Sequence, residues 1–307
     1  MNYRVIHKTE YVYQEPASLC YNEARLVPRS FERCLFTQTC LNYKILVEPT
    51  PTDYRERTDF FGNPVLYYTV RQPHRRTVIT TTSHVRLSPS PLETGDGGLP
   101  LHPAAAAPWE EVARRTLTEL AKETVEARQY VMNSPKVAVF PALAQFAAPS
   151  FEAGRPVLEA VHGLMTRIFE TLDFVPGVTT IATPLAEVLD KRRGVCQDYA
   201  HLMVGCLRAQ GLAARYISGY IETLPPPGQE KLVGADASHA WCAVYVPGLG
   251  WVDFDPTNNL IPRNQHITLG WGRDFADVTP LKGVFFSHGP HNLKVSVDVT
   301  RLEEEGK

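Results

Sequence analysis

The sequence predicts an α+β protein, in which a β-rich N-terminal region precedes a group of helices and a second sheet. Residues 1 to about 88 alternate apolar with polar side chains and are rich in β-branched and aromatic residues. Residues 109–132 and 156–174 instead carry apolar residues at steps of three and four, which is helical spacing. Strand-like patterns return over residues 215–255. Because the helices precede the later strands rather than alternate with them, the pattern is α+β rather than α/β.

The N-terminal strands predict a β-sandwich over residues 1–90. The segments that read as strands are "YRVIHKTEYVY", "CLNYKILVEP", "VLYYTV" and "TVITTTSHVRL". Turn-forming residues, "EPTPTD" and "FFGNP", separate them. Over residues 91–108, proline, glycine and small residues dominate, and neither helical nor strand periodicity occurs. This segment is therefore predicted to be a linker.

The remaining residues, 109–307, are predicted to form the functional core. Its strands are "RYISGYI", "HAWCAVYV" and "GWVDFD". The open edges of the sandwich need a partner, which could be a second copy of the chain or its own terminal strand "NLKVSVDVT". The oligomeric state therefore stays open, with a homo-oligomer as one possibility.

Composition and charge exclude several classes of partner. The 307 residues are 44% hydrophobic and carry a formal net charge of −2, without long charged blocks, so we expect neither nucleic acid nor an anionic membrane as partner. A peptide or protein substrate is expected instead. The N-terminus lacks the apolar stretch of a signal peptide and no run of about 18 apolar residues occurs, which predicts a cytoplasmic protein. The six cysteines form no CxxC pair, and in a reducing compartment most are expected to be plain buried thiols.

One cysteine lies where a nucleophile would be expected. In "KRRGVCQDYAHLMVGCLRAQG", residues 191–211, Cys196 falls in the first turn of a predicted helix that ends at Gly211. The unpaired N–H groups and the positive end of the helix dipole favour a thiolate there, and with a basic partner they can lower a cysteine pKa from about 8.5 to roughly 3.5–7.5. Cys206, on the same helix among apolar neighbours, is predicted to be core.

A base and an orienting carboxylate follow in "SHAWCAVYVPGLGWVDFDPTN". His239 begins one strand and Asp255 ends the next, but the geometry depends on the hairpin register. If residue 246 pairs with 251, Asp255 lies opposite Cys242, on the face away from His239. If 245 pairs with 251, Asp255 lies opposite Trp241, diagonal to His239 at about 7–8 Å and on its face. In that register Asp253 lies opposite residue 243, too far away, so geometry conditionally favours Asp255.

Each of these residues also has a structural explanation. A cysteine at a helix start can be core, a strand histidine can be a satisfied half-buried residue, and Asp-Pro-Thr is a common turn. Their joint occurrence in the order that a Cys-His-Asp mechanism requires favours catalysis. The residues alone nevertheless leave the catalytic and the structural interpretation open.

Nearly the whole chain resembles the bacterial transglutaminase-like family of cysteine proteins. The motifs that carry the resemblance are "GVCQDYAHLMVGCLRAQGLAARYISGYI", "SHAWCAVYVPGLGW" and "DFDPTN" in the core, "HKTEYVY", "RLVPRS" and "DFFGNPVLYYTV" in the N-terminal region, and "GRDFADVTPLKGVF" after the core. The resemblance implies a papain-like core behind a β-sandwich, with Cys196 as nucleophile, His239 as base and Asp255 as orienting carboxylate.

Further residues are weaker candidates by the same resemblance. The backbone N–H of Gln197 is a candidate oxyanion donor. Four residues are candidates for the lining of the active-site cleft: Trp241, Tyr220, Arg273 and Asp274. Packing or a structural ion pair explains each of them equally well.

The resemblance implies a thiol-dependent amidase, peptidase or acyltransferase that acts on an amide bond through a thioester intermediate. No cofactor and no metal are expected, since no HxH or HExxH spacing occurs and no acidic cluster resembles the calcium site of animal transglutaminases. One alternative is acyl transfer of the arylamine N-acetyltransferase type, which uses the same three residue types. Another is a non-catalytic binding module on the same fold.

Overall fold

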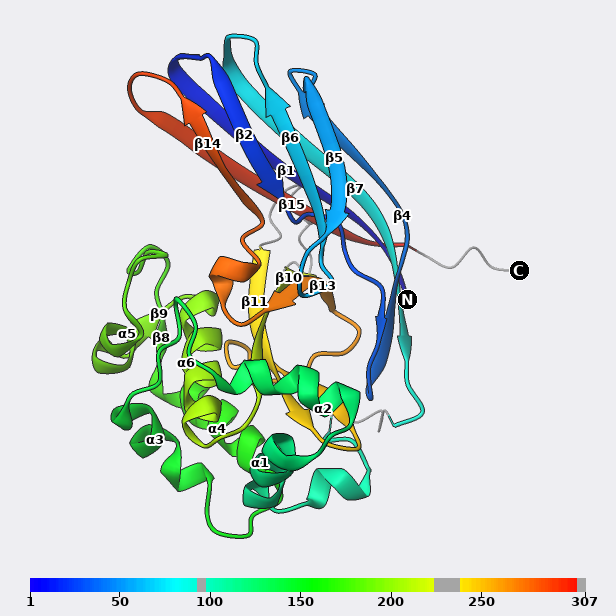
Figure 1. The fold of residues 1–307 in the computed structure, drawn as a ribbon, viewed down its shortest axis with the longest axis vertical. Coiled ribbons are helices and arrows are strands. Elements are labelled where there is room, and N and C mark those ends of the chain that lie inside the picture. The colour runs from blue at the N-terminus through cyan, green and yellow to red at the C-terminus, as the bar shows by residue number, and fades with distance from the viewer. Residues whose placement is uncertain (93–97, 224–237, 303–307) are drawn as a thin grey trace, which may run out of the picture.

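The computed structural model describes residues 1–92, 98–223 and 238–302. It has a β-sandwich at one end, a group of helices at the other, and a second sheet between them (Figure 1). The predicted α+β class, with a sandwich before a core of helices and antiparallel sheet, is confirmed. Within the described ranges, no helix is both long and apolar enough to span a bilayer.

Two antiparallel sheets form the sandwich. The larger has the order β15 (His291–Leu302), β1 (Asn2–Ala17), β7 (His74–Pro89), β4 (Phe36–Glu48) and β3 (Phe31–Glu32). The smaller has the order β14 (Leu281–Phe286), β2 (Leu19–Ala24), β6 (Pro64–Val70) and β5 (Asp53–Thr58). Alternate residues of these strands are buried between the sheets, as Ile79 of β7 against Leu66 and Tyr68 of β6 illustrates.

The core was predicted to extend to residue 307, but the last two strands of the described chain do not belong to it. β15 pairs along nearly the whole of β1, and β14 pairs with β2. The C-terminal strands thus belong to the sandwich, although they follow the core in sequence. Strand β15 contains "NLKVSVDVT", so the chain's own terminal strand covers the β1 edge.

In the described residues, the core contains a four-stranded sheet and six α-helices. The sheet has the order β12 (Gly250–Phe254), β11 (Ser238–Val246), β10 (Ala214–Ile221) and β13 (His266–Gly272). The helices are α1 (Trp109–Thr118), α2 (Lys122–Ala127), α3 (Pro141–Ala147), α4 (Val157–Thr171), α5 (Leu185–Lys191) and α6 (Cys196–Ala209). Short 3-10 turns occur at Pro103–Ala106, Arg128–Val131, Ala148–Ser150 and Phe275–Asp277, and β8 (Asp173–Phe174) pairs in parallel with β9 (Arg193–Gly194).

Helix α6 lies at the centre of the core. Every residue from Asp198 to Arg208 is buried, because the helix packs against helices α3, α4 and α5 as well as against strands β10 and β11. Cys206 is fully buried within it, as predicted, whereas Cys196 at the first position remains partly exposed. Burial on all sides fixes the direction in which the helix presents Cys196.

The β11–β12 hairpin adopts the second of the two registers considered above. Tyr245 pairs with Trp251 and Ala243 with Asp253, across a turn in which Gly248 and Gly250 take positive φ values of 87° and 94°. Continuing this register by two residues places Asp255 opposite Trp241, on the face of His239.

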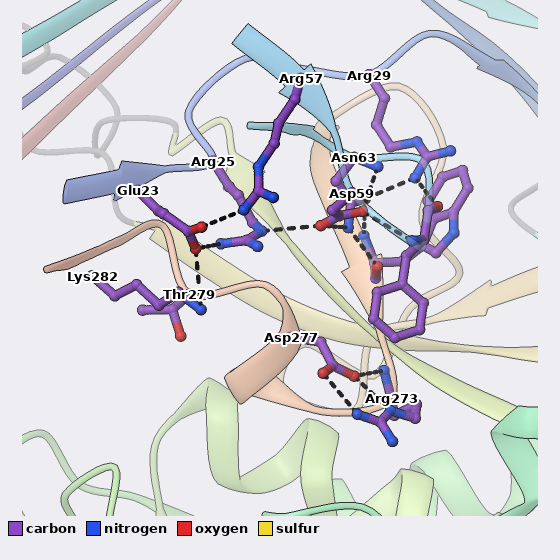
Figure 2. A network of polar contacts seen from close by, with 12 residues as sticks. Glu23, Arg25, Arg29, Arg57, Asp59, Asn63, Arg273, Asp277, Thr279 and Lys282 are labelled. Carbon is purple, nitrogen blue, oxygen red and sulfur yellow. Dashed lines mark hydrogen bonds and ion pairs between the residues drawn. The ribbon is translucent and has the colours of Figure 1, made fainter. Parts of the chain in front are cut away.

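Side-chain amides from the sandwich cover the free edge of β13. The Gln38 amide donates to the Thr268 carbonyl at 2.8 Å and accepts from the Thr268 N–H at 2.8 Å. Asn63 does the same for Trp271, donating at 2.9 Å and accepting at 3.0 Å. Figure 2 shows Asn63 held in turn by Arg29 and Asp59. The two amides imitate a neighbouring strand, so the sheet edge is satisfied without one.

We expect Gln38→Met to lower the free energy of unfolding by about 1–3 kcal/mol for each Thr268 backbone group that it leaves unpaired. Methionine keeps most of the side-chain volume, so the loss reports the hydrogen bonds rather than a cavity. Urea denaturation measures it, with Gln72→Ala, an exposed glutamine, as control. A Gln38→Met loss no larger than that of the control would show that the amide does not hold the edge.

Candidate active site

The Asp255 carboxylate is the centre of a buried hydrogen-bond network. Its Oδ2 accepts from His239 Nε2 at 2.7 Å, from His266 Nε2 at 2.9 Å and from Asn258 Nδ2 at 2.7 Å. Its Oδ1 accepts from the backbone N–H groups of Thr257 at 3.0 Å and Asn258 at 3.3 Å. The Asp-Pro-Thr-Asn turn after β12 supplies these backbone donors, so the carboxylate is both fully buried and satisfied.

These contacts set the charges of the three ionisable groups. Burial by itself would raise the pKa of Asp255, but His239 and His266 outweigh it and the net shift is downward. Burial would likewise lower the pKa of His239, yet the Asp255 carboxylate, its hydrogen bond and Cys196 raise it to about 10. For His266 burial dominates and its pKa falls, so this ring is neutral. Asp255 is therefore an anion, His239 favours the imidazolium form, and His266 is a neutral donor.

Cys196, at the start of α6, lies next to His239 of this network. It is close enough to His239 to raise the pKa of that ring, and it packs against the apolar cluster that contains Ala240. Because His239 Nε2 bonds Asp255, the ring nitrogen left for the thiol is Nδ1. The chain thus brings together the three residues predicted as nucleophile, base and orienting carboxylate, from α6, β11 and the end of β12.

The start of α6 is fixed by Asp198, a residue that the sequence analysis did not single out. Its Oδ2 accepts from the Val195 N–H at 2.8 Å and from the Thr179 hydroxyl at 2.6 Å. A Cβ on Gly194 would lie 2.7 Å from this side chain, so only glycine fits there. An acidic residue three positions after a helix N-cap is a capping signal that could have identified Asp198.

Other residues at the site carry weaker sequence signals. His266, at the start of β13, comes from a strand that pairs with β10, and no spacing in the sequence connects it to Asp255. Asn258 also approaches His239 Nε2, at 3.4 Å. Its place three residues after Asp255, in an Asx-type turn, is the signal that could have identified it.

The weaker candidates take different places. Gln197 is half-buried, directly after Cys196 in the first turn of α6. Trp241 is fully buried and stacks on His239 with ring centroids 5.9 Å apart, while its Nε1 donates to Asp253 at 3.0 Å. Arg273 forms an ion pair with Asp277 at 2.9 Å.

Cleft lining is wrong for two of these candidates. Tyr220 is fully buried and bonds His7 of β1 at 2.8 Å, because β10 packs against the sandwich there. Asp274 is also fully buried and accepts from the backbone N–H groups of Lys136 at 2.6 Å and Ala276 at 2.8 Å, so it caps a 3-10 turn. Both are structural residues.

His239, Asp255 and His266 also offer the donor set of a metal site. Their ligand atoms lie within 4.8 Å of one another. Both histidines use Nε2 to bond Asp255, however, so an ion would have to displace those hydrogens and would hold His239 as a ligand. The absence of a metal stays a prediction.

Both parts of the chain match known protein families. The bacterial transglutaminase-like N-terminal region matches residues 3–86, and the transglutaminase-like superfamily matches residues 144–256, which include Cys196, His239 and Asp255. An uncharacterised protein of Mycobacterium tuberculosis is 39% identical over 308 residues, covering 98% of this chain and 93% of that protein. A protein-glutamine gamma-glutamyltransferase of Pseudomonas aeruginosa is 40% identical over 77 residues, which cover 25% of this chain and 12% of that protein.

The fold has a counterpart among solved structures. A Cytophaga hutchinsonii protein, provisionally named a cysteine protease, superposes with a TM-score of 0.72 at 19% identity, over 100% of this chain and 92% of that one. The chain therefore belongs to the transglutaminase-like superfamily and carries the bacterial transglutaminase-like N-terminal region.

The raised pKa of His239 predicts how stability depends on pH. A group whose pKa rises from 6.5 to about 10 on folding stabilises the native state fully below pH 6.5 and loses that contribution as the pH rises towards 10. Asp255→Asn removes the main upward cause, so the stability difference between wild type and variant should shrink from pH 6.5 to 10, by up to about 1.4 kcal/mol per pH unit.

Thermal unfolding of both proteins across this pH range measures the effect. Asp53→Asn, which changes an exposed carboxylate on β5, is the control. A difference between wild type and Asp255→Asn that stays constant with pH would contradict the assignment of a charged His239–Asp255 pair.

Proposed function

We propose that this protein hydrolyses an amide bond of a peptide or protein, with Cys196 as the nucleophile and a thioester as the intermediate. The observation that supports this most is His239, which is hydrogen-bonded to the Asp255 carboxylate and whose pKa Cys196 helps to raise. A thiol beside a base that a buried anion orients is the arrangement that nucleophilic catalysis requires. The superfamily match and the presence of all three residues favour an amide-acting thiol enzyme over a non-catalytic binding module.

The chemistry would proceed in two halves. His239, as the imidazolium, holds the proton that the thiol has given up, and the Cys196 thiolate attacks the amide carbonyl to form a tetrahedral intermediate. Its C–N bond then breaks as His239 returns the proton to the leaving amine, which leaves an acyl thioester on Cys196. Water next attacks the thioester, His239 accepts a proton from that water, and the C–S bond breaks to give a carboxylic acid and the free thiol.

Two groups would assist these steps. Asp255 holds the ring of His239 in one orientation and stabilises its positive charge, and His266 and Asn258 hold Asp255. The backbone N–H of Gln197 lies in the first turn of α6, where helix N–H groups lack intrahelical partners. We assign it to the oxyanion of the tetrahedral intermediate, together with the positive end of the helix.

The first test is the reactivity of the six cysteines with iodoacetamide at neutral pH, located by peptide mapping. Burial raises the pKa of the other five cysteines, to about 11 for Cys34, so they remain thiols. We expect Cys196 to react at least about tenfold faster than any of them, and His239→Ala to remove that advantage. Cys40→Ala, which removes a partly exposed cysteine, is the control. If Cys196 reacts no faster than Cys40 in folded protein, the binding-module alternative replaces ours.

The second test asks which acceptor resolves the thioester. Water needs no binding site of its own, whereas an amine acceptor does. With a p-nitrophenyl ester as acyl donor, we expect the free acid as main product even with methylamine present, and at least about 10³-fold slower turnover in Cys196→Ala. Amide as the main product would make the protein an acyltransferase, as the name of the Pseudomonas aeruginosa relative describes that protein. Equal turnover in Cys196→Ala would contradict the thioester itself.

A further inference from the structure

A second concave site lies behind the catalytic sheet. It is a cavity of about 1150 Å³, lined by residues of the sandwich, of the α1–α2 region and of all four strands of the core sheet. Tyr245 of β11 faces it, whereas the alternate residues Val244 and Val246 pack with α6. The cavity is therefore on the face of the sheet opposite α6, and neither Cys196 nor His239 lines it.

Arginine and tryptophan side chains are stacked along its wall. The Arg215 guanidinium lies between two indoles, 4.0 Å from the ring centre of Trp251 and 3.9 Å from that of Trp271. Arg29 lies 3.3 Å above the ring of Trp271, and Arg33 5.0 Å from it. Stacking covers the faces of a guanidinium but leaves its N–H donors at the edge free for an acceptor.

Several N–H groups of these three arginines have no hydrogen-bond acceptor among the described residues. Arg215 is only 4% exposed, and no acceptor for it occurs among the described residues; its Nε is buried without a hydrogen bond. Nε and Nη2 of Arg33 and Nε of Arg29 are buried and unpaired as well. In the described part of the chain, Asp253, paired with Arg33, is the one carboxylate in an ion pair with any of the three.

The three positive charges also act on one another. Burial lowers the pKa of Arg215 most, Arg33 and Arg29 lower it further, and Tyr130 and Asp253 oppose this shift without reversing it. Arginine nevertheless keeps its proton at neutral pH, so the charge persists in a poorly solvated place. Asp253 offsets one of the three charges, and Glu32, Glu119, Glu123 and Glu126 also line the cavity, but none of these glutamates is in an ion pair with the three arginines among the described residues. A bound anion would reduce the remaining repulsion and accept hydrogen bonds from Arg215.

We infer that this cavity binds a small molecule through a carboxylate or phosphate group, whose oxygens accept from Arg215 while Trp251, Trp271 and Tyr130 enclose the remainder. Guanidinium pairs with both oxyanions through two parallel hydrogen bonds. Aromatic walls with a few convergent polar groups are typical of ligand sites, and the volume suits a molecule larger than the oxyanion alone. The site is independent of the proposed catalysis, since it contains none of the three catalytic residues.

Tryptophan fluorescence and thermal unfolding test this inference, with inorganic phosphate and benzoate as probes and sodium chloride keeping the ionic strength constant. Two of the four tryptophans line the cavity, so binding should change the fluorescence saturably. We expect one or both anions to raise the melting temperature by roughly 2–4 °C near saturation. A response to phosphate alone assigns a phosphate group, and a response to benzoate alone assigns a carboxylate.

Arg215→Met should weaken binding at least about tenfold, because it keeps a long side chain between the indoles and removes the charge. Arg114→Gln, which removes an exposed charge on α1, should bind like wild type. As a second readout on wild type, phosphate or benzoate should protect Arg215 from phenylglyoxal, located by peptide mapping. If neither anion acts beyond chloride, or if Arg215 is not protected and Arg215→Met binds like wild type, the site is structural only.

Discussion

The register of the β11–β12 hairpin is the constraint on which both sites depend. Because Tyr245 pairs with Trp251, Asp253 of β12 and Asp255, which directly follows this strand, project to the same side of the sheet. Asp255 receives His239 and His266, whereas Asp253 receives the Trp241 indole and Arg33. A slip of one residue would turn both carboxylates to the opposite face, where α6 packs. The turn glycines that fix this register therefore determine the catalytic geometry and part of the cavity together.

Side chains of the sandwich contact the core sheet that carries the candidate active site. Gln38 and Asn63 complete the edge of β13, the strand that begins with His266. Arg33, from the segment between β3 and β4, reaches Asp253 on β12. Strands β14 and β15 return from the core to the sandwich, so the chain connects the two parts at both ends of the core. The N-terminal region thus supports the core sheet through side-chain contacts, although its strands lie in separate sheets.

The Asp255 carboxylate and the arginines of the cavity are both buried, but they differ in how many of their hydrogen-bonding groups have partners. The Asp255 carboxylate accepts five hydrogen bonds, two of them from histidines, and is held as an anion in one orientation. The arginines of the cavity stack on indoles but lack acceptors for several N–H groups. A satisfied buried charge is rigid and suits a group that orients a base. Unsatisfied donors at a cavity wall suit a group that awaits a partner.

The sequence alone determined the class of fold and the local position of each catalytic candidate. Periodicity located α6 and the strands, and a cysteine in the first turn of a helix can be identified from spacing. It also narrowed the carboxylate to Asp255, provided that one of two registers held. Only the tertiary structure selected that register, placed His266 against Asp255, buried Tyr220 and Asp274, and returned residues 281–302 to the sandwich. These features depend on contacts between residues far apart in the chain, which local periodicity does not encode.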